Sequence, residues 1–407
     1  MHVMHIENFD GESLLRELES CFSKDEVEEL SRTSKFVQRS TSRLTGLSFL
    51  MMNVFDSSDG KERSLNDCCD WLEDHFEISM AKQSLDERFN TDAVSFMRQS
   101  FNRILGIVNG GVSNRLIDLP FSRIQLTDST SFQIPSNLST FYLGYIGNGG
   151  ESIIKMHLNY NLLNGEIADI FLTDGVAHDN LYKKGKHEKI EPKGLYIKDL
   201  GYYDAVSLNK IAEEGAYFLS RSKSNSIYSL LNEKGKHIRI DIADHLPKKG
   251  KTKELDVYVG AKTKVSARLI MQSVPEEIAM KRLEKLEKNT AKQKGRKVSE
   301  QAKKMCWFNM YITNASKAEL PASIVRLVYT LRWQIELMFK IWKSVFDIDK
   351  VKSMSIFRFE CYIYSKLIAI LLTLHIQNKL GQFLWDEDEF EISPIKAAKL
   401  IKKNYQA

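Results

Sequence analysis

The chain has 407 residues, of which 43% are hydrophobic and 27% charged, enough for two or three domains with real cores. Its formal net charge of +5 is a mild basic excess, which is compatible with nucleic-acid binding but does not establish it. The five cysteines show no metal-ligand spacing, and adjacent Cys68 and Cys69 suit no ordinary bridge, so we expect an intracellular, reduced protein.

The first 115 residues are expected to form an all-helical domain. The amino-terminal stretch shows no charged segment followed by an apolar one, so no signal peptide is expected. In "SLNDCCDWLEDHFEISMAKQSLDERF", Ser64 is expected to cap one short helix and Ser79 a second, with a short turn around residues 76–78. Two such helices can form a helix-turn-helix or belong to an ordinary helical domain, and no single residue distinguishes the two.

The helix-turn-helix interpretation makes the second helix a DNA-reading element. A recognition helix keeps its base-contacting side chains near its start. Lys82, Gln83, Asp86 and Arg88 would lie on that helix. Lys82 and Arg88 are therefore candidate DNA contacts.

The pattern of residues 116–222 predicts a mixed sheet. "FSRIQLTDST" predicts a short strand ending on Asp128, and "SIIKMHLNYNLLNGEIADIFLTDG" predicts a hairpin turning at Asn164-Gly165. A polar, helical connection, "AHDNLYKKGKHEKI", comes before a strand that ends on Asp199. A helix in "LNKIAEEG" and a strand in "AYFLSRS" follow. This order favours the α/β class, with helices packed on a mixed sheet.

Residues 223–312 are expected to form a β-rich insertion. Three strand-like segments precede a charged helix, and ten Lys/Arg stand against three Glu between Lys281 and Lys304. That charge suits either a solvated helix face or a surface that contacts phosphates. Trp307 ends the insertion and either packs in the core or stacks on an unpaired or flipped base.

Residues 313–350 carry a glutamate in an apolar stretch, "YTLRWQIELMFKIWK". A helix that is apolar almost all round is usually buried, and a buried carboxylate is costly unless it is paired or holds a metal. At about 100° per residue, the polar side chains form one stripe roughly 60° wide. Its members are Tyr329, Arg332, Glu336 and Lys343.

Two interpretations of Glu336 stay open at this point. Arg332, Glu336 and Lys340 are spaced four apart, which suits a salt-bridge ladder. The alternative is that Glu336 is a metal ligand.

Trp333 and Trp342 are expected in the core. Residues 351–407 are expected to be helical, and the apolar run 367–376 is too short to span a bilayer, so it reads as a core helix.

Asp128 and Asp199 each follow a short apolar strand, and ligands gather at the carboxyl ends of strands. Clustered carboxylates repel unless cations bind them, and Mg²⁺ prefers oxygen ligands. Glu336 from a packed helix would complete a two-metal site. Chemistry alone leaves three competitors for the second ligand: Asp174, Asp179 and Asp204.

The stripe Tyr329, Arg332, Glu336 and Lys343 resembles, spacing for spacing, the Tyr-(2)-Arg-(3)-Glu-(6)-Lys signature of a branch of bacterial insertion-sequence DDE transposases, the family named after insertion sequence four. "LTDST" is similar to that family's first-aspartate motif. "IKDLGYYD" followed by "IAEEGAYFLSRSKSN" is similar to its second-aspartate region. Leu200 departs from the basic residue that many members carry.

The resemblance implies a ribonuclease-H-like catalytic core, interrupted by the insertion and preceded by a helical DNA-binding region. It implies cut-and-paste transposition by two-metal phosphoryl transfer on Asp128, Asp199 and Glu336, with Mg²⁺ as cofactor and Mn²⁺ as a possible substitute. Tyr329, Arg332 and Lys343 would then contact DNA phosphates.

The implied partners are double-stranded DNA, as transposon terminal inverted repeats and target, and a second copy of the chain in the synaptic complex. No membrane partner is expected, and the implied location is the bacterial cytoplasm, at the nucleoid. A metal-dependent nuclease of the same fold acting outside transposition is one alternative. A non-catalytic, transposon-derived DNA-binding protein is the other.

Overall fold

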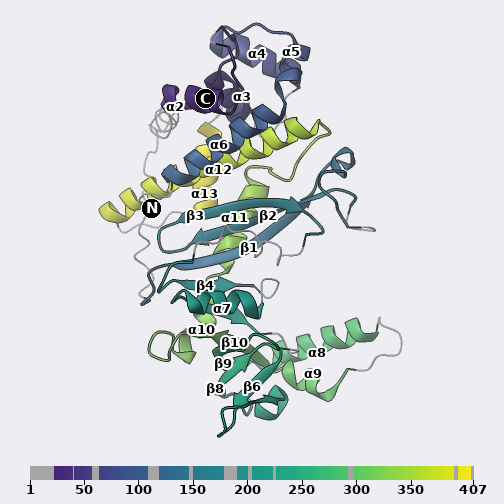
Figure 1. Ribbon diagram of the computed structural model, residues 1–407, viewed down its shortest axis with the longest axis vertical. Coiled ribbons are helices and arrows are strands. Elements are labelled where there is room, and N and C mark those ends of the chain that lie inside the picture. The colour runs from purple at the N-terminus through teal and green to yellow at the C-terminus, as the bar shows by residue number, and fades with distance from the viewer. Residues whose placement is uncertain are drawn as a thin grey trace.

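The computed structural model describes residues 23–39, 41–56, 64–108, 119–145, 150–177, 190–199, 204–222, 226–291, 298–388 and 393–404. Asp179 and most of the predicted helical connection before Asp199 lie outside these ranges. Figure 1 shows an elongated molecule with a layer of helices at one end, a large sheet in the middle and a smaller group of strands and helices at the other end.

Between residues 23 and 108 the described segments are helical, as the sequence predicts. They are α2 (Lys24–Thr33), α3 (Gly46–Asp56), α4 (Leu65–Phe76), α5 (Lys82–Arg88) and α6 (Thr91–Val108). The Ser64 cap is confirmed, since its side chain accepts from the Asp67 amide and the Asp67 carboxylate accepts from the Ser64 amide. The Ser79 cap is wrong, because α5 begins later, after Ala81.

Arg88 is held inside the helical region. Its guanidinium donates to the Phe36 carbonyl at 2.6 Å and lies 4.5 Å from the centre of the Phe36 ring. Burial lowers the pKa of Arg88. These contacts favour a bracing role for Arg88 over the DNA contact that the sequence suggests, whereas Lys82 is exposed at the start of α5.

The described strands form one ten-stranded sheet in the order β3-β2-β1-β4-β5-β10-β9-β8-β6-β7. β1 pairs antiparallel with β2 and β2 with β3, whereas β4 runs parallel to both β1 and β5. The predicted mixed α/β class is therefore confirmed. The first five strands are β1 (Ile124–Gln133), β2 (Ile153–Asn161), β3 (Glu166–Asp174), β4 (Leu195–Lys198) and β5 (Tyr217–Arg221).

Two local predictions in this half of the sheet have different outcomes. The Asn164-Gly165 hairpin is confirmed: β2 and β3 pair antiparallel, and Gly165 has φ +71°, which suits glycine. The strand expected to end on Asp128 instead continues to Gln133. Residues 128–133 of β1 pair with residues 153–158 of β2, so Asp128 lies within the strand.

The strands of the predicted insertion extend the same sheet, since β10 pairs with β5 on one side and β9 on the other. They are β6 (Tyr228–Leu231), β7 (His237–Ile240), β8 (Thr252–Val259), β9 (Val265–Ser273) and β10 (Phe308–Thr313). The charged segment forms α8 (Glu276–Ala291) and α9 (Glu300–Met305). In Figure 1 these elements lie at the end of the molecule away from the helical layer. Helix α7 (Ala205–Glu213) packs on β5 and β9.

The stretch with the polar stripe is two helices, α10 (Ala322–Thr330) and α11 (Trp333–Ser344). At their junction the amides of Leu331 and Arg332 donate three residues back, to Val328 and Tyr329, which tightens the turn. Arg332 therefore stands at the start of α11. Glu336 lies in its first turn, where the helix dipole favours a negative charge.

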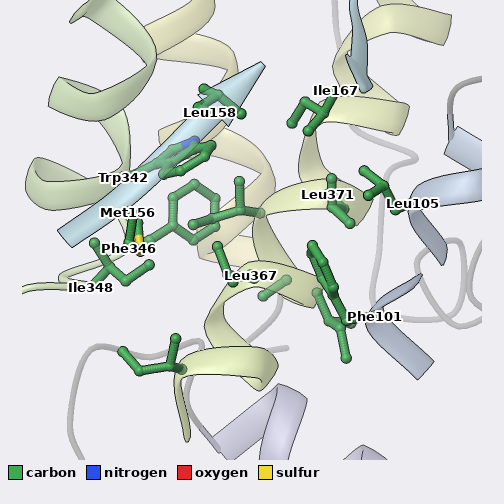
Figure 2. Packing of buried hydrophobic residues seen from close by; sticks show 14 of the residues in the cluster. Phe101, Leu105, Met156, Leu158, Ile167, Trp342, Phe346, Ile348, Leu367 and Leu371 are labelled. Carbon is green, nitrogen blue, oxygen red and sulfur yellow. The ribbon is translucent and has the colours of Figure 1, made fainter. Parts of the chain in front are cut away.

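Helix α11 packs against β1 through a continuous apolar core. Figure 2 shows Trp342 and Phe346 beside Met156 and Leu158, with Leu367 on the neighbouring helix. Trp342 is 1% exposed, so its predicted core position is confirmed, but Trp333 is 69% exposed and that prediction is wrong. The exposed indole stands next to Arg332 in the chain.

Helix α12 (Ile356–Asp388) is long and apolar enough over residues 356–379 to cross a membrane, but 78% of its most apolar window is buried inside the protein. It packs against α3, α6 and α13 (Pro394–Asn404). The apolar run 367–376 is therefore part of a core helix, as predicted.

Candidate carboxylate site

Asp128 of β1 and Asp199, which directly follows β4, lie side by side. The parallel register of β1 and β4 pairs Thr127 with Lys198, so the next residue of each strand is an aspartate. Ile124 and Leu126 share the alternation of Asp128 and belong to the core beneath α11. Both carboxylates therefore start from the face of the sheet that α11 covers.

Glu336 joins these aspartates through the side chain of Arg332. The Arg332 guanidinium lies 2.5 Å from Asp128 Oδ2, 2.6 Å from Glu336 Oε1 and 3.9 Å from Asp199 Oδ1. The structure thus brings together three carboxylates that are far apart in the chain. The predicted burial of Glu336 is wrong, since its side chain is 40% exposed. The side chains of Asp128 and Arg332 are more buried than that of Glu336, since each is only 15% exposed.

Burial raises the pKa of Asp128 to about 6, and the charges of Asp199 and Glu336 add to that rise. The Ser129 amide, which donates to Asp128 Oδ1 at 2.8 Å, and the Arg332 guanidinium act in the opposite direction. Burial alone would lower the pKa of Arg332, but the three carboxylates and Tyr329 raise it. Arg332 therefore stays charged, and Asp128 binds a proton more readily than an exposed aspartate does.

This shift predicts how stability depends on pH in the metal-free protein. The folded pKa of Asp128 is above its unfolded value, so the folded chain keeps a proton that the unfolded chain loses between about pH 4 and pH 6. The free energy of unfolding should fall by roughly 3 kcal/mol over that interval on account of this group. Urea unfolding in EDTA should show the fall in wild type and lose that component in Asp128→Asn. Equal pH slopes in the two proteins would contradict it.

Tyr329 and Lys343 flank the carboxylates on the same helical stretch. The Tyr329 hydroxyl donates to Asp199 Oδ1 at 3.4 Å, and burial followed by the Asp199 charge raises the pKa of Tyr329. Lys343 Nζ donates to the Ser131 carbonyl of β1 at 3.0 Å, and burial lowers its pKa. The polar stripe therefore lies along β1, from Asp199 at one end to Ser131 at the other.

The competitors for the second aspartate lie elsewhere. Asp174 pairs with Ile154, which pairs with Phe132, so it is two strands away and about 13 Å further along the strands than Asp128. Its carboxylate accepts from the Ala177 amide at 2.7 Å. Asp204 caps α7 by accepting from the Ser207 amide. Of the described aspartates predicted for this position, only Asp199 adjoins Asp128.

The donor set suits a hard divalent cation, because three carboxylates reach one small region. Within the described ranges, however, no group of three or more His, Cys, Asp or Glu side chains is arranged to hold a metal ion as it stands. The Arg332 guanidinium lies among the oxygens that would be ligands. The residues therefore fit a divalent cation once that guanidinium moves aside.

A group of three arginines lies beside the site, and no pattern in the sequence indicates it. Arg221 ends β5 and pairs with Tyr311 of β10, whose ring lies 5.4 Å from the Tyr329 ring. Arg282 of α8 donates to the Asn309 side chain at 2.7 Å; burial and then repulsion by Arg221 lower its pKa. Only the pairing of distant strands brings these cations together.

Arg326 completes this arginine group from the exposed side of α10. Its charge acts on both Tyr311 and Arg282. In the part of the chain that the structure describes, no ion pair joins Arg221 or Arg326 to a carboxylate. Among the described residues, the positive charge of this arginine group is therefore not neutralised by ion pairs, and it lies on the insertion side of the carboxylates.

Trp307 precedes β10, four residues before Tyr311. Its carbonyl accepts from the Val274 amide, and Lys249 Nζ lies 3.4 Å from the centre of its ring. The indole is half-buried, with a cation against its ring. It is neither an exposed stacking platform nor a fully buried core residue.

Comparison with known proteins gives consistent matches. Residues 119–372 match the family described as "Transposase DDE domain". The chain is 34% identical to the transposase for insertion sequence element IS1151 of Clostridium perfringens, over 94% of this chain and 84% of the relative. It is 30% identical to the transposase for IS231F of Bacillus thuringiensis subsp. israelensis, over 95% of this chain and 84% of the relative.

Proposed function

The chain belongs to the family of transposases with a DDE domain, and from that membership we propose that Asp128, Asp199 and Glu336 are the metal ligands with which it cuts and joins transposon ends. The observation that carries this proposal is the meeting of three carboxylates from β1, β4 and α11 around one guanidinium. In the ribonuclease-H-like core of the family, Asp128 lies on β1 and Asp199 directly follows β4.

Mg²⁺, or Mn²⁺ in its place, would be held by the three carboxylates and would supply activation of the attacking oxygen and stabilisation of the leaving one. The chain itself contributes position. Neighbouring rigid strands fix Asp128 and Asp199, and packing of α11 on β1 fixes Glu336. Burial of Asp128 and Arg332 limits the water around the reacting phosphate.

The cations beside the carboxylates are proposed to hold the DNA backbone. Arg332 offers a planar fork and Lys343 a point charge, and Tyr329 offers a hydroxyl. The arginine group formed by Arg221, Arg282 and Arg326 continues this positive surface toward the insertion. A phosphate there would relieve the repulsion between these guanidinium groups.

The insertion is proposed to contact the same DNA. Residues 223–312 hold 21 Lys/Arg against 10 Asp/Glu, so this segment carries more than the whole formal excess of +5. Trp307 lies on the insertion side of Tyr311, about 13 Å along the strand. There it could stack on an unpaired or flipped base if that base displaced Lys249.

Removing two lysines from α8 tests the insertion's role. Lys281 and Lys285 are exposed, and removal of each phosphate contact should reduce the salt slope of DNA affinity by about 0.9. The double variant Lys281→Gln, Lys285→Gln should therefore bind with a slope about 2 units smaller than wild type. The control is Lys396→Gln, Lys399→Gln on α13, which lies beside α12 and away from α8 (Figure 1); it should keep the wild-type slope. Equal slopes in the two variants would refute the contact.

The partners proposed for this enzyme are the terminal inverted repeats of its own element, target DNA and a second copy of the chain, because two ends must be held together for joining. The proposed location is the bacterial cytoplasm, at the nucleoid. Lys82 on α5 is proposed to contact end DNA from the helical region, residues 1–115. The other proposed parts are a core at 116–222 and 313–350, an insertion at 223–312 and a helical end at 351–407.

A cleavage and strand-transfer assay tests the proposed function. With Mg²⁺ and duplexes carrying the terminal sequences of the element, the chain should cut at the transposon end and join the new 3′ end to target DNA. Cleavage without end specificity or joining would favour a nuclease acting outside transposition. Binding without cleavage would favour a non-catalytic DNA-binding protein, and either result would overturn the proposal.

A further inference from the structure

Arg332 occupies the space in which the three carboxylates converge. Its Nη1 and Nη2 atoms contact Asp128 Oδ2 and Glu336 Oε1, and its Nε lies 3.9 Å from Asp199. The side chain is only 15% exposed, and among the residues that the structure describes its buried Nε has no hydrogen-bond partner. The guanidinium is therefore enclosed by the site and forms part of it.

The oxygens that Arg332 contacts are those a metal ion would need. Asp128 Oδ1 accepts from the Ser129 amide at 2.8 Å, which leaves Oδ2 as the more available oxygen, and Arg332 holds that atom. Glu336 likewise gives Oε1 to the guanidinium. A divalent cation and a guanidinium repel each other, so the two cannot share these oxygens.

The charges at the site favour replacement of the Arg332 guanidinium by divalent cations over its permanent presence among the carboxylates. One guanidinium neutralises only one of the three carboxylates, whereas divalent cations would compensate the cluster more fully. Arg332 stands at the tight junction before α11, so its long side chain can turn away while the backbone stays in place. Once the Arg332 guanidinium leaves the carboxylates, its planar set of donors can bind two oxygens of a phosphate.

We propose that Arg332 is an internal counter-ion that closes the carboxylate site in the free protein and passes to a DNA phosphate when divalent cations bind. This inference rests on the proposed role of Asp128, Asp199 and Glu336 as metal ligands. It makes metal binding and DNA binding one coupled event. By linkage, DNA raises the affinity for the metal by the factor with which the metal raises the affinity for DNA.

The test is the affinity of the full chain for Mn²⁺, measured from the electron paramagnetic resonance signal of free Mn²⁺, with and without a short duplex of the element's terminal sequence. Arg332→Gln removes the counter-ion. Without DNA it should bind Mn²⁺ about tenfold more tightly than wild type, and DNA should then add little further affinity. Wild type should gain about tenfold from DNA.

A matched control separates exchange from general electrostatics. Lys340→Gln removes the same charge from the same helix, one turn after Glu336, at an exposed position. It should keep the wild-type Mn²⁺ affinity within about twofold and keep the gain from DNA. If Arg332→Gln does not fold, Arg332→Lys replaces it in the test. Because a single ammonium cannot reach all three carboxylates, Arg332→Lys should bind Mn²⁺ more tightly than wild type.

Two outcomes would overturn the inference: wild-type Mn²⁺ affinity in the Arg332 variant without DNA, or an undiminished gain from DNA in that variant. Failure of the proposed function has a different signature. In that case Glu336→Gln would bind Mn²⁺ as tightly as wild type, with DNA present or absent. A thermal melt in EDTA and in Mn²⁺ gives a second readout, since Mn²⁺ should raise the melting temperature of Arg332→Gln more than that of wild type.

Discussion

Asp199→Asn is expected to abolish cleavage and strand transfer, with a loss of about three orders of magnitude or more, while end-DNA binding persists. Asparagine keeps the shape of the side chain but loses the charge that a divalent cation needs. Asp199 directly follows β4, where the register places it beside Asp128. The measurement is the rate of single-turnover end cleavage in Mg²⁺, with binding followed by gel shift.

Asp174→Asn is the matched control for that result. Asp174 also stands at the end of a strand, but it lies two strands away and its carboxylate accepts from the Ala177 amide. Cleavage by this variant should stay within about tenfold of wild type, since only a turn is weakened. Loss of cleavage in Asp174→Asn with retention in Asp199→Asn would show that the second ligand is assigned to the wrong strand.

Trp342→Ala is expected to lower the free energy of unfolding by about 3–5 kcal/mol. Trp342 is 1% exposed, its ring lies 5.6 Å from the Phe339 ring, and Figure 2 shows it packed beside Leu158 of β2. The indole fixes α11 against the sheet, and α11 carries Glu336. Urea unfolding measures the loss, and the partly loosened helix should also reduce cleavage.

Trp333→Ala provides the contrast, because the same residue type stands nine positions earlier at the start of α11. With 69% of its surface exposed, Trp333 has little packing to lose, and its replacement should change stability by no more than about 0.5 kcal/mol. Comparable destabilisation by both variants would contradict the packing described for α11. A loss of DNA affinity in Trp333→Ala without loss of stability would identify a contact between the exposed indole and DNA.

Local chemistry allowed much of the fold to be predicted from the sequence. The capping box at Ser64, the Asn164-Gly165 turn and the strand before Asp199 each depend on residues within a few positions. The strand through Asp128 was predicted too short. Its polar second half, "STSFQ", stays extended because it pairs along its whole length with β2, and no local pattern reports that pairing.

The site depended on long-range geometry that spacing cannot reveal. The signature singled out Arg332 and Glu336, but only the fold shows that Arg332 reaches Asp128 across 204 residues of sequence. The arginine group of Arg221, Arg282 and Arg326 is assembled by β5, α8 and α10 and has no sequence pattern of its own. The insertion strands continue the core sheet because β10 pairs with β5 and β9, and pairing between such distant segments cannot be predicted from local sequence.

Asp128, Asp199 and Glu336 are proposed to bind divalent cations together. Crystals of the complex with end DNA, grown in Mn²⁺, test this claim through the anomalous scattering of manganese. Two peaks about 3.5–4 Å apart, touching oxygens of all three carboxylates and of the phosphate at the transposon end, are the expected result. Manganese bound at other carboxylates, with Arg332 still among these three in the DNA complex, would contradict the claim.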